Sequence, residues 1–102
     1  MTVRELNIQL PMEKIEAFCL QNPIKKLSLF GSVLRDDFAE GSDVDFLVEL
    51  LPDARIGLFK FMEMQFQLED MIGRKVDLRT IENFPDRLRD HVLATAKSVY
   101  VR

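Results

Sequence analysis

Residues 27–50 read LSLFGSVLRDDFAEGSDVDFLVEL, and this stretch decides the fold. An apolar run at 27–30 predicts a short strand, which the Gly31-Ser32 pair ends with a turn. Apolar and polar residues alternate over 43–50, a pattern typical of a strand with one buried face. The buried face should carry Val44, Phe46 and Val48, and the opposite face Asp43, Asp45, Leu47 and Glu49.

Helices alternate with strands over the rest of the chain. This order predicts an α/β (α+β) fold class, with a small mixed β-sheet of three to four strands and helices packed against it. At 102 residues the chain is expected to form a single domain over 1–102. Helices are expected at 11–21, 33–37, 56–72 and 85–97, and further strands at 75–79 and 99–101.

The composition is that of an ordinary globular protein, with 47% hydrophobic and 30% charged residues. A net charge of −3 argues against sequence-independent binding to nucleic acids, which requires a surplus of clustered cations. Cys19 is the single cysteine and cannot form an internal disulfide. No signal-peptide pattern and no apolar stretch of membrane-spanning length is found, so a cytoplasmic protein without membrane contact is expected.

Three aspartates stand at strand positions where this residue is depleted. Asp43 and Asp45 share one strand face about 7 Å apart, and Asp77 lies between the apolar Val76 and Leu78. Carboxylates on adjacent strands repel one another unless cations lie between them. Mg²⁺ takes oxygen ligands and leaves room for substrate phosphates. The pattern therefore predicts a metal site, against the alternative of accidental surface charge.

Gly31 and Ser32 follow an apolar strand and open a predicted helix. Glycine allows a phosphate to approach the backbone, and the free N–H groups of a helix start attract anions. The alternative is that Ser32 only caps the helix. Arg35 stands where a capping box would have Glu or Gln. A cation there opposes the helix dipole, which favours a bound anion nearby.

The order of these motifs resembles the nucleotidyltransferase superfamily of DNA polymerase beta. The Gly-Ser pair is followed after ten residues by the paired aspartates, and then by a third aspartate on the next strand. The length is similar to that of the minimal nucleotidyltransferases (MNT) of this superfamily, although the loop at 36–41 is more acidic than usual for the family. The resemblance implies catalytic and metal-binding roles for Asp43, Asp45 and Asp77, and nucleotide binding by Gly31, Ser32 and Arg35.

The resemblance also implies a reaction and a partner. Minimal members pair with a helical HEPN toxin, and the expected activity is transfer of AMP from ATP, with two Mg²⁺ ions, to a hydroxyl such as tyrosine on that toxin. The chain would then be an antitoxin within a hetero-oligomer. Two alternatives stay open: an antitoxin that neutralises its partner by binding alone, and a nucleotidyltransferase that acts on a small molecule or an RNA end.

The helix expected at 56–72 carries more apolar residues than one buried face needs. A second stripe beside the core face is either a protein interface or the shoulder of the core, and the shoulder is favoured. His91 is expected at the surface, Cys19 in the core, and Tyr100 packed on an edge strand, with self-modification as its alternative. Arg87 and Arg89 are expected on a solvated face rather than on RNA. The core face comprises Leu58, Phe61, Met64, Leu68, Met71 and Ile72, and the second stripe Phe59, Met62 and Phe66.

Overall fold

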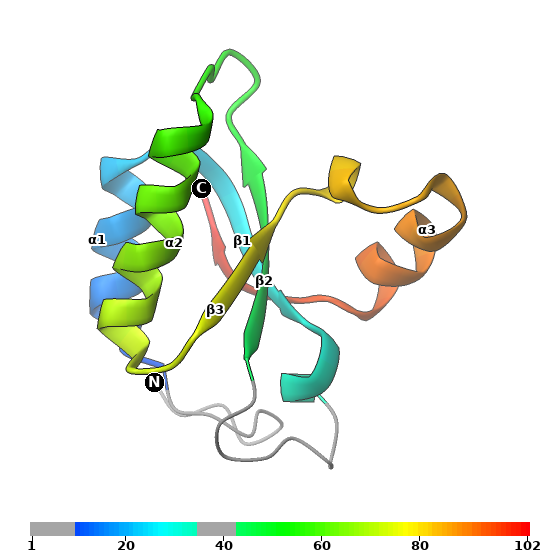
Figure 1. Cartoon of the computed structure of the whole chain (residues 1–102), viewed down its shortest axis with the longest axis horizontal. Helices are drawn as coiled ribbons and strands as arrows, with labels where there is room; N and C mark the ends of the chain where they lie inside the picture. Colours follow the sequence, from blue (N-terminus) through cyan, green and yellow to red (C-terminus); the bar gives the residue numbers. More distant parts are fainter. Residues whose placement is uncertain (1–9, 35–42) are drawn as a thin grey trace.

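The computed structural model describes residues 10–34 and 43–102. They form a four-stranded sheet with helices on either side, as Figure 1 shows. The elements are α1 (Met12–Gln21), β1 (Ile24–Phe30), the 3₁₀ turn η1 (Gly31–Leu34), β2 (Val44–Leu50), α2 (Leu58–Ile72), β3 (Val76–Arg79), the 3₁₀ turn η2 (Ile81–Asn83), α3 (Asp86–Thr95) and β4 (Lys97–Val101).

The sheet is mixed, with strand order β3-β2-β1-β4. β1 pairs antiparallel with β2 and with β4, whereas β2 and β3 are parallel. A parallel pair needs a crossover connection, and α2 supplies it. The predicted fold class is therefore confirmed, and the C-terminal edge strand forms as expected.

The core lies between the sheet and the layer made by α1 and α2 (Figure 1). The predicted alternation of β2 is confirmed, because Val44, Phe46 and Val48 are buried in this core. Asp45 and Glu49 therefore lie on the opposite face of the sheet, on the side of α3. The helices contribute Ile15, Phe18 and Cys19 from α1, and Met64 and Leu68 from α2.

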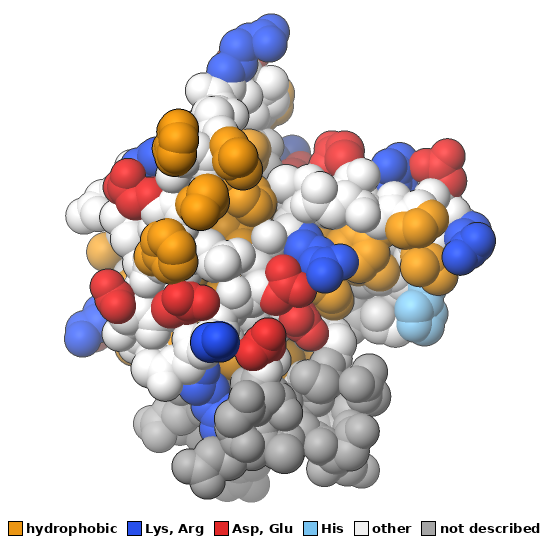
Figure 2. All heavy atoms as spheres, viewed as in Figure 1, with side chains coloured by type: hydrophobic (Ala, Val, Ile, Leu, Met, Phe, Trp, Pro, Cys, Tyr) orange, Lys and Arg blue, Asp and Glu red, His pale blue; other side chains and the backbone are white. Residues whose placement is uncertain are grey.

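The prediction for α2 was partly wrong. Leu58, in the first turn of the helix, is 71% exposed and does not belong to the core face. The second stripe is not a shoulder of the core, since Phe59 is 87%, Phe66 53% and Met62 41% exposed. Figure 2 shows hydrophobic side chains gathered over this helix. α2 ends as expected at Gly73, whose N–H donates to Glu69.

The C-terminal region corrects one further expectation. Arg89 is not simply solvated: its guanidinium donates to the backbone oxygens of Glu82 and Phe84 and pairs with Asp86 at 2.8 Å. It thereby fixes α3 to the turn before it. His91 is exposed, and Tyr100 packs against the core, both as predicted. In the described part of the chain, no helix combines the length and the apolar character needed to cross a membrane.

The thiol of Cys19 should be unreactive in the folded protein. Burial raises the pKa of its thiol from 9.0 to about 12, against a smaller opposing effect of Arg102. At pH 8 the folded protein should therefore react with a disulfide reagent only as fast as it unfolds. In the unfolded chain the thiol ionises at its ordinary pKa, so the free energy of unfolding should fall as the pH rises from about 9 to about 12. Thermal melts of wild type and Cys19→Ala across this pH range isolate the effect. An equally steep fall in both proteins would contradict it.

Candidate active site

Two of the predicted carboxylates lie side by side on the open face of the sheet. Asp45 of β2 pairs in register with Asp77 of β3 and, on its other side, with Phe30 of β1. Paired residues on neighbouring strands point to the same face and are about 5 Å apart at the backbone. Both aspartates are half-buried between buried apolar neighbours, which fixes their direction.

Asp43 comes directly before β2 and is exposed. The N–H of the next residue, Val44, donates to the carbonyl of Lys75 at 2.9 Å, so the start of β2 is tied to the start of β3. Asp43 is two residues from Asp45, which places it on the same face at the edge of the site. All three predicted aspartates thus come from the same end of the β2–β3 pair, and two of them, Asp45 and Asp77, are paired in register.

The donor set suits a metal that shares its coordination with a substrate. Within residues 10–34 and 43–102, no three carboxylate, imidazole or thiolate groups converge into a ready set of metal ligands. Mg²⁺ usually takes only one or two carboxylates and completes its shell with water and substrate phosphates. The neighbouring carboxylates of Asp45 and Asp77 fit that kind of site, and they do not fit an all-protein cage.

Gly31 is required where β1 ends. Its φ is +77°, a left-handed conformation that favours glycine. A Cβ at this position would overlap the Asp45 carboxylate, with the Asp45 Cγ only 3.3 Å away. The sequence predicted a glycine that lets phosphate approach, and the structure adds that this glycine makes room for Asp45. Arg35 and the side chain of Ser32 lie outside the described residues, so their assignments stay predictions.

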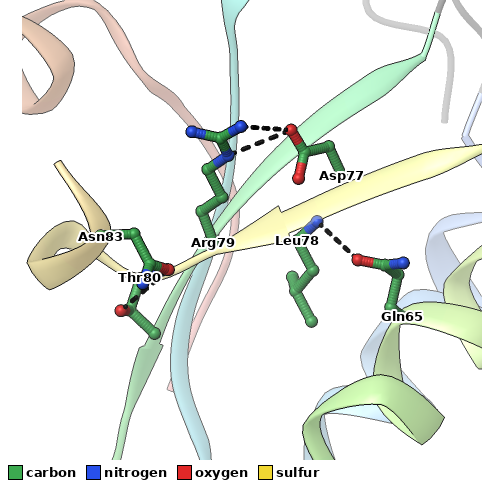
Figure 3. A network of polar contacts seen from close by, with 6 residues as sticks. All are labelled: Gln65, Asp77, Leu78, Arg79, Thr80 and Asn83. Atoms are coloured by element: carbon green, nitrogen blue, oxygen red, sulfur yellow. Dashed lines mark hydrogen bonds and ion pairs between the residues drawn. The ribbon is translucent and has the colours of Figure 1, made fainter.

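Arg79 is a site residue that the sequence reasoning missed. Its Nε and Nη2 atoms both lie 3.0 Å from Oδ2 of Asp77, as Figure 3 shows. The guanidinium also lies over the ring of Phe84, at 5.7 Å from its centroid, and this ring meets Phe30 edge-on at 5.4 Å. Asp77 therefore has a cation of the protein itself beside it. The i, i+2 spacing of Asp77 and Arg79 on a predicted strand was the available signal.

Side chains of α2 hold the outer edge of β3. Gln65 accepts a hydrogen bond from the N–H of Leu78 at 3.2 Å (Figure 3), and Glu69 accepts one from the N–H of Val76 at 3.0 Å. These bonds satisfy backbone groups that an edge strand would otherwise leave open. They also fix the backbone on both sides of Asp77, which lies between the two bonded residues.

Comparison with known proteins assigns the family. The family model described as a nucleotidyltransferase domain matches residues 12–99. The chain belongs to this family. A candidate protein adenylyltransferase of Methanocaldococcus jannaschii, MJ0435, is 32% identical over 94 residues, which cover 92% of this chain and 99% of the relative. Protein adenylyltransferase MntA of Thermococcus cleftensis is 38% identical over 55 residues, and the match spans 54% of each protein. The chain is thus a nucleotidyltransferase, as its motifs predicted.

Solved structures share its fold. A candidate minimal nucleotidyltransferase superposes with a TM-score of 0.69 at 29% identity, covering 83% of this chain and 85% of the other. A toxin–antitoxin crystal structure with AMP-PNP gives a TM-score of 0.72 at 21% identity, covering 91% and 75%. A tri-AMPylated Shewanella oneidensis HEPN toxin in complex with MNT antitoxin gives 0.64 at 20% identity, covering 89% and 70%. At these last two identities the likeness concerns the fold alone.

Proposed function

We propose that this nucleotidyltransferase transfers AMP from ATP to a hydroxyl of a HEPN-type partner protein and so acts as an antitoxin. The observation that carries the proposal is the register pairing of Asp45 with Asp77, with Gly31 packed against Asp45. Support for the acceptor comes from the relatives, which are described as protein adenylyltransferases. Proteins of the same fold occur with AMP-PNP and with an AMPylated HEPN toxin.

The reaction is an in-line displacement at phosphorus. The acceptor oxygen, tyrosine being the expected source, forms a bond to the α-phosphorus of ATP. The bond from that phosphorus to the oxygen bridging the β-phosphate breaks, and pyrophosphate leaves. Asp77 would orient the acceptor hydroxyl and take its proton, which passes on to water. The Gly31 turn and, by resemblance, Ser32 and Arg35 bind the phosphates.

Asp43, Asp45 and Asp77 would hold Mg²⁺, with two ions expected by resemblance. When bound, Mg²⁺ stabilises charge on the attacking and leaving oxygens. The protein contributes the direction of the carboxylates, which β2, β3 and the α2 side chains fix. It also contributes Arg79, whose guanidinium pairs with the Asp77 carboxylate.

A second candidate function is an antitoxin that works by binding alone. The exposed stripe Phe59, Met62 and Phe66 favours it, because large apolar side chains on one helix face are typical of protein interfaces. The two functions are separated by incubating the chain with Mg²⁺, α-labelled ATP and a purified HEPN-type partner protein. Label on that protein, lost when EDTA removes the metal, supports the enzyme. A stable complex without label supports the binding antitoxin.

Arg79→Gln should bind divalent cations more tightly than wild type. The guanidinium competes with a metal for Oδ2 of Asp77, so its removal lowers the local positive charge. We expect the dissociation constant of Mn²⁺ for the nucleotide-free protein, measured by electron paramagnetic resonance, to fall roughly fivefold. The exposed Arg55→Gln serves as the charge-matched control and should leave it unchanged. Unchanged or weaker Mn²⁺ binding in Arg79→Gln would show that Arg79 and the metal do not share Asp77.

A further inference from the structure

β2 is longer than its neighbour β3 and extends beyond it. The pairing of β2 with β3 ends at Leu47 and Arg79, but β2 continues to Leu50. From Thr80 onward the chain leaves the sheet toward η2 and α3, as Figure 1 shows. In the part of the chain that the structure describes, no other strand lies beside residues 48–50 on that side.

The backbone groups of Leu50 point to this open side. Along a strand, successive residues direct their N–H and C=O groups alternately to the two neighbours. The N–H of Val44 donates to Lys75 on the β3 side, and the N–H of Leu51 donates to Pro23 on the β1 side. Leu50 is six residues from Val44, an even number, so its backbone N–H and C=O groups also face the β3 side. Such an edge is a template for an added strand.

A groove of about 530 Å³ runs beside this edge. Ile81 and Leu93 form part of its apolar wall, and Glu49 and Glu82 place two carboxylates along it. The ion pair of Glu49 with Lys25, at 3.6 Å, is about half exposed to solvent and is therefore weak. The groove thus offers backbone hydrogen bonds, an apolar wall and a local negative charge.

We propose that this groove binds an extended segment of the acceptor polypeptide as a short strand against residues 48–50 of β2. An apolar side chain of the segment lies against Ile81 and Leu93, and a Lys or Arg faces Glu49 and Glu82. The inference rests on the proposed function, because residues 48–50 lie about 10–17 Å along β2 from Asp45. An extended peptide covers this distance in three to five residues, so the bound segment would position a nearby acceptor hydroxyl.

Substitutions in and beside the groove test the proposal through the Michaelis constant for the helical partner. Leu93 and Leu88 are exposed on the same helix, but only Leu93 lines the groove. Leu93→Trp should raise the KM for the partner at least tenfold and leave the KM for ATP unchanged, and Leu88→Trp should change neither. Glu82→Lys should also raise the partner KM, whereas Glu16→Lys, on α1, should not. If the partner KM were the same in Leu93→Trp as in Leu88→Trp, and the same in Glu82→Lys as in Glu16→Lys, the proposal would be overturned.

Hydrogen exchange gives a readout that does not need turnover. In the Asp45→Asn protein, which should bind the partner without modifying it, adding the partner should slow exchange of the Leu50 amide at least tenfold. Slowing confined to α2, or no change at Leu50, would overturn the groove assignment. Slow exchange at Leu50 with no AMP transfer by wild type would keep the groove and refute the proposed reaction. AMP transfer by wild type without slower exchange at Leu50 would support the proposed reaction and refute the groove assignment.

Discussion

Asp45→Asn should lower AMP transfer at least about 10³-fold while the protein stays folded. The two side chains have nearly the same shape, so the position beside Gly31 stays filled. The amide lacks the charge that holds a divalent cation, and loss of several kcal/mol of transition-state stabilisation corresponds to this factor. The rate of label transfer and the circular dichroism spectrum check the two halves of the prediction.

Asp70→Asn is the matched control, because Asp70 is exposed on α2 away from the site. It removes the same charge from the same kind of side chain and should leave the transfer rate unchanged. If Asp45→Asn kept more than a tenth of the wild-type rate, Asp45 would not be the metal-binding centre of the reaction. If the spectrum collapsed, the carboxylate would serve the fold rather than the chemistry.

Gly31→Ala should impair both stability and catalysis. The left-handed backbone at φ +77° costs a residue with a Cβ about 1–2 kcal/mol, which lowers the Tm by roughly 5–15 °C. The added methyl group also overlaps the Asp45 carboxylate and must displace it. A displacement of about 1 Å at a reacting centre can cost a factor of about 10², so transfer should fall by at least that much.

Gly73→Ala separates the two effects. Gly73 has nearly the same backbone angle, φ +75°, but an added Cβ meets nothing within 4 Å. The Tm of the Gly73→Ala variant should fall by a similar amount because of backbone strain, and its transfer rate should equal that of wild type. Equal transfer rates in the two alanine variants would show that the contact between Gly31 and Asp45 has no part in catalysis.

The sheet and the aspartate pair followed from the sequence because both depend on period-two alternation. Val44, Phe46 and Val48 had to share a face, and the polar residues between them had to share the other. The positions of the turns were equally readable, since Gly31 and Gly73 both adopt the left-handed backbone that glycine favours. These features are local, and local patterns determine them.

Other features depend on contacts between distant segments. The stacking of Arg79 on Phe84 requires the turn after β3 to bring Phe84 beside the guanidinium, which no periodicity specifies. The exposure of Phe59 depends on which face of α2 packs on the sheet. The groove exists only because β2 runs on after β3 has left it. The roles of Ser32 and Arg35 stay predictions from the resemblance, because the side chain of Ser32 and all of Arg35 lie outside the described residues.

Intact-mass spectrometry tests the central claim most directly. The purified chain is incubated with Mg²⁺, ATP and the HEPN-type partner protein, and the masses of both proteins are measured. We predict that the partner gains the mass of one or more AMP units, and that neither Asp45→Asn nor EDTA-treated protein produces this gain. A tight complex in which neither chain gains mass would contradict the account and would leave this protein an antitoxin that acts by binding alone.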